Sequence, residues 1–446
     1  MIMAFVKVDF SSPSVGNIRP LHGVNSGPMT KVFTYDARAL FREGGFPFAR
    51  LHDVEYPYGS GEFVDIPCIF KDFDADETLE ESYNFGLTDE YIRHIIEVGS
   101  KPIFRLGVSI EHAPVKRYIY PPKDYLKWSR ICEHIIRHYN EGWANGYHWD
   151  IEYWEIWNEA DGGDNMWLGS PEDFYELYCV SATYLKERFP HLKIGGCAFT
   201  RPDNVFSRGF FDYITAKPRR IPLDFYSWHK YFTKIEDLRR YLAQSAAILE
   251  EYGYSDAENV FDEWNYMKDW GDQFDSYVKL KNHIGAAYCA ATLCTLQTES
   301  SVDLAAYFEA DVVKEWCGIF EVVNMAIGKR QKAELGPRKP FYSFKYFNAL
   351  YGMKNEKSVE KIGEGIYACA AANGDRAGLM IANYRDCGDT VKVELSGLPT
   401  GGIEVLVTDK DRTNERSLSF EGESVSFELQ MTENSVVYVG TPIDGE

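Results

Sequence analysis

The sequence lacks the features that mark membrane proteins and nucleic-acid-binding proteins. It contains no run of about 18 or more apolar residues, which excludes a transmembrane helix. Its N-terminal segment has no basic stretch followed by a long apolar one, so no secretion signal is predicted. Positive charge is scarce, with 47 Lys and Arg against 68 Asp and Glu and a formal net charge of −21. Because phosphate binding requires a basic surface, we expect neither nucleic acid nor an acidic membrane as a partner.

Cysteine and histidine motifs that bind metals are also absent. The nine cysteines, at positions 68, 132, 179, 197, 289, 294, 317, 369 and 387, contain no Cys-x-x-Cys pair. An odd, dispersed set of this kind predicts reduced, mostly buried thiols in a cytoplasmic protein. The ten histidines show no His-Glu-x-x-His spacing, so we predict no metal site and no cofactor.

Aromatic residues, by contrast, are abundant. They make up 15% of the chain, with 10 Trp, 30 Tyr and 28 Phe. Aromatic rings build protein cores and also stack against sugars, so this enrichment is a mild indication of carbohydrate binding. At 446 residues, the chain is long enough for a large barrel and an accessory domain.

Short β-type segments alternate with longer helical segments over residues 19–352. The eight predicted strands are 21–25, 46–51, 102–106, 153–158, 193–195, 225–228, 259–262 and 303–308. Amphipathic helices are predicted at 125–139, 171–188, 235–252 and 274–297. Eight strands that each precede a helix are typical of a (β/α)8 TIM barrel, although a doubly wound open sheet can produce the same alternation.

The pattern changes after residue 352. Alternating segments at 365–371, 378–383, 390–395, 403–409 and 435–439 are separated by turn residues such as Asn373-Gly374. They predict a β-sandwich over residues 353–446. Residues 4–10 alternate in the same way, so we expect segment 1–18 to add a strand to that sandwich. The predicted fold class is α/β: a (β/α)8 TIM barrel with a C-terminal β-sandwich accessory domain.

Two acidic motifs end the fourth and seventh predicted strands. The first, Tyr-Trp-Glu-Ile-Trp-Asn-Glu-Ala-Asp over 153–161, carries Asn158 and Glu159, and the second, Asn-Val-Phe-Asp-Glu-Trp-Asn over 259–265, carries Glu263. Active sites of barrels form at the carboxyl ends of the strands. Hydrolysis of a glycosidic bond needs one carboxylic acid to protonate the leaving oxygen and a second carboxylate to attack the sugar or activate water. The two motifs therefore predict a glycosidase with Glu159 and Glu263 as its catalytic pair.

The order and spacing of several motifs resemble the clan A glycoside hydrolases, and most of all family 39, which contains β-xylosidases and α-L-iduronidases. These motifs are Gly23-Val24-Asn25 with Pro28, Arg50-Leu51-His52-Asp53, Tyr83-Asn84-Phe85, Trp157-Asn158-Glu159, Phe225-Tyr226-Ser227-Trp228-His229 and Lys339-Pro340-Phe341. The resemblance covers nearly the whole chain. One motif departs from it, because family 39 more often has Thr-Glu-Phe-Asn where this chain has Asp262-Glu263-Trp264-Asn265. That sequence motif resembles the one in family 51 α-L-arabinofuranosidases and leaves the identity of the sugar open.

The resemblance implies a retaining double displacement with Glu159 as general acid/base and Glu263 as nucleophile. Retention requires carboxyl groups roughly 5–5.5 Å apart. By the same resemblance, Asn158 would donate to the sugar 2-hydroxyl, and Tyr231 beside His229 would orient the nucleophile. Asn158 could otherwise cap a strand end, and His229 could be a structural residue.

Further candidates follow the second strand. The resemblance implies that His52 contacts sugar hydroxyls in the −1 subsite. Asp53 could do the same, or could cap the loop that follows. Arg50 would lie inside the barrel, where a buried guanidinium needs a carboxylate partner.

Two other segments are expected near the mouth of the predicted barrel. After the eighth strand, Asp311 and Glu315 are candidate hydroxyl ligands and Trp316 is a candidate stacking platform, although such a loop can also be only a connection. Segment 56–84, rich in acidic and aromatic residues, is expected to overhang the mouth and narrow it to a pocket. A pocket favours action on chain ends.

The sequence therefore predicts a cytoplasmic, retaining exo-glycoside hydrolase of pentose-containing oligosaccharides, β-xylosidase-like, with an α-L-arabinosidase as the alternative. An α-L-iduronidase would need basic residues facing the sugar carboxylate. The presence of Lys230 and of segment 101–105 does not establish whether such residues face the sugar. A second class of function is a carbohydrate-binding barrel without catalytic activity. The presence of both carboxylates disfavours it. A barrel aldolase would need a Schiff-base lysine at a strand end, and no predicted strand end carries one. The expected partner is an oligosaccharide, and a homo-oligomer is possible.

Overall fold

Eight parallel strands form a closed barrel in a computed structural model, which describes residues 4–28, 30–31, 35–54, 62–271, 273–310, 316–324, 334–385 and 387–443. The order around the barrel is β10-β11-β12-β3-β6-β7-β8-β9. The strands are β3 (Gly23–Asn25), β6 (Phe48–Arg50), β7 (Lys101–Leu106), β8 (Tyr153–Ile156), β9 (Lys193–Phe199), β10 (Phe225–Phe232), β11 (Glu258–Tyr266) and β12 (Leu304–Tyr307). Every predicted barrel strand overlaps one of them. The (β/α)8 barrel is confirmed, and the doubly wound open sheet is excluded by the closure.

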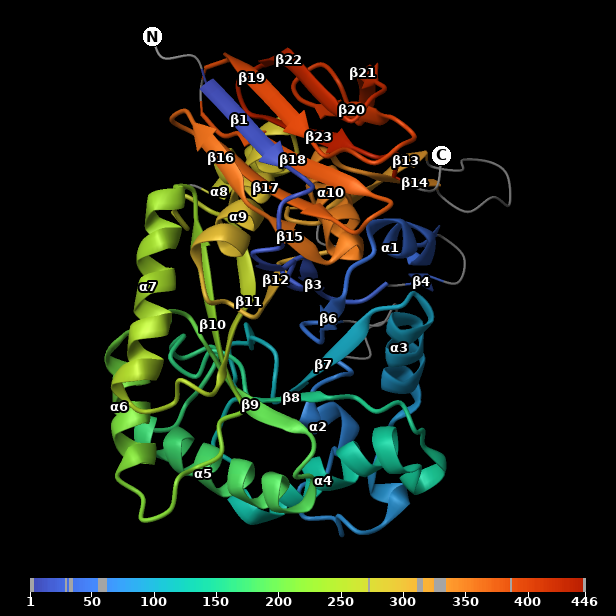
Figure 1. The fold of residues 1–446 in the computed structure, drawn as a ribbon. Coiled ribbons are helices and arrows are strands. Elements are labelled where there is room, and N and C mark those ends of the chain that lie inside the picture. Colours follow the sequence, from blue (N-terminus) through green and yellow to red (C-terminus); the bar gives the residue numbers. More distant parts are fainter. Residues whose placement is uncertain are drawn as a thin grey trace.

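Helices follow the barrel strands and surround them (Figure 1). They are α1 (Arg38–Gly44), α2 (Ile66–Ile69), α3 (Gly86–Glu97), α4 (Tyr125–Glu141), α5 (Pro171–Arg188), α6 (Val205–Thr215), α7 (Ile235–Glu251), α8 (Gln273–Leu280), α9 (His283–Glu299) and α10 (Lys339–Met353), with single 3₁₀ turns at Glu80–Ser82 and Trp143–Asn145. The single helix predicted at 274–297 was wrong, because the chain breaks into α8 and α9 there. Asn282 causes the restart: its side chain caps α9 by accepting a hydrogen bond from the backbone N–H of Ile284.

Two further sheets pack as the predicted sandwich. One has the order β16-β1-β19-β22 and the other β2-β15-β17-β18-β23-β20-β21. Their strands are β1 (Ala4–Asp9), β2 (Gly16–Asn17), β15 (Asn355–Lys357), β16 (Val359–Ile362), β17 (Ile366–Ala372), β18 (Ala377–Asn383), β19 (Asp389–Ser396), β20 (Ile403–Thr408), β21 (Glu415–Phe420), β22 (Ser424–Met431) and β23 (Ser435–Gly440). Strand β1 lies between β16, antiparallel to it, and β19, parallel to it. The proposed domain limits, 1–18, 19–352 and 353–446, stay a prediction.

Several strands of the structure were not predicted. They are β2, β15, β16, β21 and β22 in the sandwich, and two small hairpins, β4 (Thr30–Lys31) with β5 (Tyr35–Asp36) and β13 (Phe320–Asn324) with β14 (Glu334–Pro337). Strand β21 shows the reason: nearly all of its residues are exposed, so no apolar face gives it a period of two.

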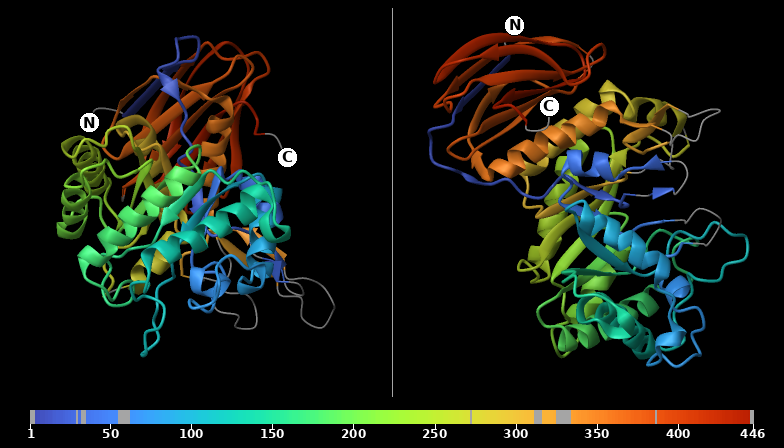
Figure 2. Two further views of the ribbon diagram at one scale, coloured as in Figure 1. Left: turned by 90° about the horizontal axis from the view of Figure 1, so that it is seen from below. Right: turned by 90° about the vertical axis from the view of Figure 1, so that its right-hand side faces the viewer.

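The sandwich rests on the barrel through α9 and α10, as the right-hand view of Figure 2 shows for α10. Strand β17 explains how one apolar segment serves two cores. Its residues Ala368 and Ala370 face the other sheet, whereas Tyr367, Cys369 and Ala371 face the helices. The thiols of Cys294 on α9 and Cys369 lie 3.4 Å apart at this contact. Both faces of the strand are therefore buried.

The interior of the barrel is built in layers that repeat every two residues. The lowest layer is apolar and consists of Phe48, Ile103, Tyr153, Phe225, Val260 and Leu304. Two residues further along five of these strands come the polar side chains Arg50, Arg105, Glu155, Ser227 and Asp262, all buried. The next positions on β10 and after β6 bring His229 and His52 to the carboxyl-end mouth. The polar middle layer is thus the floor of the candidate site.

None of the helices in the described ranges combines the length and the apolar character needed to cross a bilayer. The nine cysteines are free thiols, and Cys387 alone among them is exposed.

Candidate active site

The turn after β8 aims Glu159 into the mouth of the barrel. Trp157 and Glu159 have φ angles of 71° and 48°, in the left-handed region that side chains other than glycine rarely adopt. The end of β7 approaches this turn closely at Gly107, where a Cβ would lie only 2.9 Å from the Cα of Trp157. The backbone N–H of Glu159 donates to the carbonyl of Ala198, 3.0 Å away, which fixes the turn against β9. Backbone strain held in place by its surroundings is typical of a functional position.

A β-bulge brings the second motif to the same mouth. Between the pairs Ser227–Val260 and His229–Glu263, strand β11 has one residue more than β10. The extra residue turns both Asp262 and Glu263 toward the interior, which a regular strand could not do. Trp264 points the other way and packs against Tyr288, Tyr307 and Phe344.

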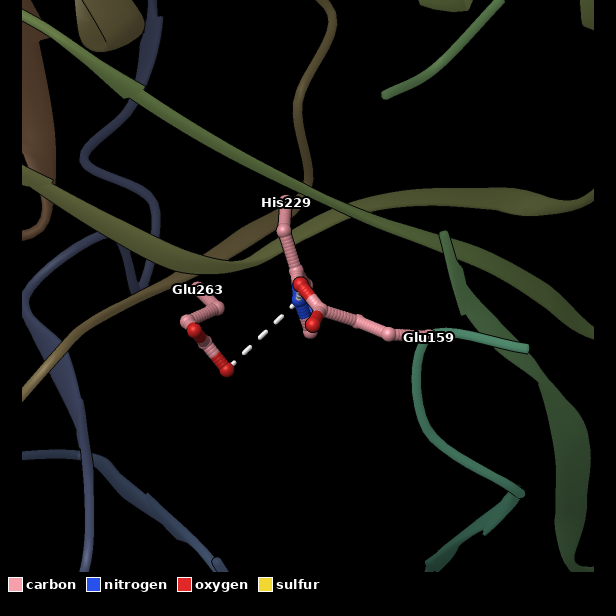
Figure 3. Close-up of side chains that lie close together, drawn as sticks. All are labelled: Glu159, His229 and Glu263. Carbon is pink, nitrogen blue, oxygen red and sulfur yellow. Dashed lines mark hydrogen bonds and ion pairs between the residues drawn. The ribbon is translucent and has the colours of Figure 1, made fainter. Parts of the chain in front are cut away.

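His229 lies between the two glutamates (Figure 3). Its Nδ1 is 2.7 Å from Oε1 of Glu159 and 3.5 Å from Oε2 of Glu263. One carboxylate oxygen from each glutamate and one imidazole nitrogen fall within 4.8 Å of one another. The side chain of Glu159 is 24% exposed, and that of Glu263 is 8% exposed. The two acids therefore face one small space, with Glu159 on the more open side.

Donors surround the carboxylate of Glu263. The Tyr231 hydroxyl donates to its Oε1 at 2.7 Å, and Nε2 of His52 lies 2.8 Å from its Oε2. A terminal nitrogen of Arg50 lies 3.4 Å from the same oxygen. Such a setting holds a carboxylate ionised and in one orientation, as a nucleophile requires.

Opposite pKa shifts separate the two acids. Burial raises the pKa of Glu159 above its usual range, and the negative charges of Glu263 and Asp161 add to the shift, although the hydrogen bond with His229 opposes it. Burial would also raise the pKa of Glu263, but His229, His52 and Arg50 outweigh it and hold that pKa well below its usual range. Two carboxyl groups with pKa values pushed apart are the signature of an acid and a base or nucleophile.

Asn158 is oriented by Arg50. A terminal nitrogen of Arg50 donates to Oδ1 of Asn158 at 2.7 Å, and the Nε lies 2.7 Å from Oε2 of Glu155. Since its oxygen is occupied, Asn158 presents its amide N–H groups to the pocket that it lines. The predicted carboxylate partner of Arg50 is therefore Glu155, and Arg50 also links Asn158 to Glu263.

His52 and Asp53 lie at the mouth as predicted, but in contact with each other. Nδ1 of His52 is 3.2 Å from Oδ1 of Asp53, so both ring nitrogens of His52 face carboxylates. Burial lowers the pKa of His52, but Asp53 and Glu263 outweigh that effect and raise the pKa to about 9. Nδ1 of His52 also accepts a hydrogen bond of 2.8 Å from the backbone N–H of Asp53, and the direct partner of Nε2 is the carboxylate of Glu263.

One pocket of about 890 Å³ is lined by the predicted site residues His52, Asp53, Asn158, Glu159, His229, Tyr231 and Glu263. Aromatic rings form part of the pocket wall, and of these Trp270 and Phe308 were not predicted from the sequence. The ring of Trp270 lies 5.4 Å from that of Tyr231 and 6.5 Å from that of Trp316. The ring of Phe308 lies 5.8 Å from that of Trp316. Trp270 is 58% exposed at the rim. Asp311 and Glu315 lie outside the described residues.

The segment predicted to overhang the mouth is described only in part. Residues 55–61 lie outside the described ranges, while Val54 and Glu62 on either side of them line the pocket. Phe63 and Phe70 point into the core, where they contact Tyr91 and Tyr83.

Glu159, His229 and Glu263 are also the one cluster among the described residues compact enough to surround a metal ion. Nδ1 of the imidazole is hydrogen-bonded to Glu159 and lies 3.5 Å from Glu263, and the pKa shifts of the two glutamates fit proton transfer. We therefore interpret the cluster as a proton-transfer site.

Replacing Tyr231 by Phe removes the hydroxyl that donates to Glu263. A hydrogen bond to a charged group contributes about 1.5–3 kcal/mol, so we expect kcat to fall roughly 10- to 150-fold with KM changed much less. Steady-state kinetics on an aryl glycoside measures both. A Tyr231→Phe variant with native kcat would show that this contact does not assist the reaction.

The shifted pKa values predict the dependence of kcat/KM on pH. Activity needs Glu159 protonated and Glu263 ionised, so it falls as pH rises through the raised pKa of Glu159 and as pH falls through the lowered pKa of Glu263. We expect a bell whose alkaline limb lies above the usual pKa range of a glutamate and whose acid limb lies below it. A value of kcat/KM that keeps rising from neutral into alkaline pH would contradict the assignment of Glu159 as the acid.

A closed eight-stranded barrel with two glutamates of opposite pKa shift at its carboxyl-end mouth is the arrangement of the barrel glycoside hydrolases. The family model described as "Glycosyl hydrolases family 39" matches residues 48–261, which include Glu159 and all strands from β6 to β10. Residues 48–261 of the barrel are thus similar to family 39 of the glycoside hydrolases.

Individual relatives agree with the family. A β-xylosidase of Geobacillus stearothermophilus is 26% identical over 190 residues, which cover 40% of this chain and 36% of that protein. Among solved structures, a glucosidase of Croceicoccus marinus has a TM-score of 0.80 at 23% identity, over 100% of both chains. A thermostable family 51 α-L-arabinofuranosidase of Thermotoga petrophila has a TM-score of 0.69 at 14% identity, over 98% of this chain and 100% of that one. The two structural likenesses show a shared fold of barrel and sandwich.

Proposed function

We propose that the protein is a retaining exo-glycoside hydrolase that acts on pentose-containing oligosaccharides in the manner of a β-xylosidase. The observation that carries this proposal is the close approach of Glu159 and Glu263, whose nearest oxygens lie within 4.8 Å. Retaining enzymes hold their carboxyl groups about 5–5.5 Å apart, whereas inverting enzymes hold them about 6.5–9.5 Å apart to admit a water.

The reaction would proceed in two displacements. Glu159 donates its proton to the glycosidic oxygen while an oxygen of Glu263 attacks the anomeric carbon, so the bond to the leaving group breaks as the glycosyl ester forms. Glu159, now ionised, then takes a proton from water, and that water displaces Glu263. Asn158 would donate its oriented amide N–H to the sugar 2-hydroxyl, a contact that tightens in the transition state.

The choice of sugar rests on relatives and on one motif. A β-xylosidase is the relative quoted above, and it favours a xyloside. The sequence Asp262-Glu263-Trp264-Asn265 favours an arabinoside as the second candidate, because it resembles the family 51 pattern. The aromatic wall formed by Trp270, Trp316 and Phe308 would stack against the sugar in either case.

A panel of aryl glycosides tests the proposal. The purified protein is assayed on p-nitrophenyl β-xylopyranoside, α-L-arabinofuranoside and β-glucopyranoside, and the anomer first released is identified by proton NMR. We expect the highest kcat/KM on the xyloside and a first product of retained configuration. Highest activity on the arabinofuranoside would select the alternative, and absence of cleavage on all three would favour a binding protein. The cytoplasmic location and the oligomeric state stay predictions.

A further inference from the structure

A charged cluster lies directly beneath the catalytic pair. Arg50, Glu155 and Asp262 are each fully buried, with 0% of their surface exposed. The Nε of Arg50 lies 2.7 Å from Oε2 of Glu155 and 3.1 Å from Oδ2 of Asp262. Two carboxyl groups therefore share one guanidinium nitrogen in a region without water-exposed surface.

The neighbours decide which of the two acids carries a proton. Glu155 also accepts a hydrogen bond of 2.6 Å from the Ser227 hydroxyl, so it has donors on both oxygens. Neither oxygen of Asp262 has a well-aligned hydrogen-bond donor among the described residues. Two carboxyl groups so close together cannot both be ionised in a buried site. The proton therefore lies on Asp262. Burial, and then the charge of Glu155, raise the pKa of Asp262 well above its usual range in spite of Arg50.

Asp262 faces the back of the histidine that contacts the acid/base. Nε2 of His229 lies 3.4 Å from Oδ1 of Asp262 and has no well-aligned hydrogen-bond partner among the described residues, while the carboxyl group of Asp262 also interacts with that of Glu155. On the other side of the ring, Nδ1 lies 2.7 Å from Oε1 of Glu159. The three groups form a line from the floor of the barrel to the acid/base.

We propose that Asp262 is a positioning residue: as an uncharged carboxylic acid it holds Nε2 of His229, and thereby keeps the N–H at Nδ1 directed to Oε1 of Glu159. The other oxygen of Glu159 is then left to carry the proton that the leaving group receives. The inference rests on the proposed function for its consequence in catalysis.

The charges around the imidazole explain why an uncharged group is needed there. His229 is faced by Glu155 and Glu159 from β8 and its turn, by Asp262 and Glu263 from β11, and by Arg50 and His52 from β6 and its end. Arg50 and His52 already contact Glu263. If Asp262 were ionised, its carboxylate would compete with Glu159 for the imidazole N–H. A neutral carboxyl group at Asp262 satisfies Nε2 without that competition.

Two substitutions of similar shape separate the uncharged hydrogen-bonding role from the charge. Asp262→Asn keeps a neutral group that can bond Nε2, and Asp262→Leu keeps the branched shape without any polar atom. We measure kcat/KM against pH on aryl glycosides whose phenols are good or poor leaving groups, and the infrared carboxylic-acid band of native protein minus Asp262→Asn at neutral pH.

We expect Asp262→Asn to stay within about threefold of native on both substrates, with the alkaline limb unmoved. Asp262→Leu should lose about 100-fold on the poor leaving group, which needs the acid, and much less on the good one. The infrared difference should contain one carboxylic-acid band.

Three results would overturn the inference: loss of activity in Asp262→Asn with a shifted alkaline limb, equal losses on both leaving groups in Asp262→Leu, or no carboxylic-acid band in the difference spectrum. The infrared arm requires neither turnover nor a folded leucine variant. A native protein inactive on every aryl glycoside would therefore refute the proposed function, while the band alone would still decide the state of Asp262.

Discussion

Replacing Glu263 by Gly should reduce kcat/KM roughly 10⁴- to 10⁶-fold, the largest effect of any single substitution in this chain. The substitution removes the carboxylate that His52, Tyr231 and Arg50 hold ionised, and with it the first displacement. Azide enters the vacated space and attacks the anomeric carbon directly. A single displacement inverts configuration, so a β-glycoside with a good leaving group should yield the α-glycosyl azide.

A matched control uses the same substitution at a glutamate remote from the pocket. Glu299 at the end of α9 pairs with Arg239, and Glu299→Gly should keep native activity without any response to azide. If Glu263→Gly retained activity within an order of magnitude of native, or produced the β-azide, Glu263 would not be the nucleophile.

Glu159→Ala should show the second largest effect, and one that depends on the leaving group. Glycosides with poor leaving groups should lose about 10²- to 10⁴-fold in kcat/KM, because they need the proton, while activated aryl glycosides lose little. Azide should rescue turnover by attacking the glycosyl ester on Glu263, which gives the β-azide of retained configuration. The alkaline limb of the pH profile should disappear with the carboxyl group.

Product analysis by proton NMR and a series of phenols with different pKa values measure these effects. Equal losses for all leaving groups, or an α-azide from Glu159→Ala, would show that Glu159 has another role. The two variants thus give opposite azide products, and each serves as a control for the other.

The barrel and the pocket could be predicted from sequence because their signals are local. Each barrel strand is a short apolar segment, and the strand-end positions of Asn158, Glu159, His229 and Glu263 place them at one edge once the barrel closes. The structure brings them to one pocket, together with His52, Asp53, Tyr231 and Trp316. Their roles remain predictions that the variants above test.

What sequence could not predict depends on contacts between distant strands. The bulge that turns both Asp262 and Glu263 inward is visible only in the pairing of β11 with β10. The contact from Arg50 to Asn158 spans β6 and the turn after β8, 108 residues apart in the chain. Trp270 sits in a loop after β11, and no strand-end signal connects its ring to those of Tyr231 and Trp316. A two-residue period from Phe48 to Arg50 and from Val260 to Asp262 could have indicated the polar middle layer.

The most direct test of the account is to trap the covalent intermediate. A 2-deoxy-2-fluoro glycoside with an activated leaving group, built on the preferred sugar, should accumulate as a glycosyl ester. The fluorine slows both displacements, whereas the activated leaving group keeps the first one fast enough for the ester to form. Mass spectrometry of the intact protein and of its peptides locates the label. The account predicts the mass of one glycosyl group on the peptide containing Glu263, and a label on another residue, or turnover with an inverted product and no label, would contradict it.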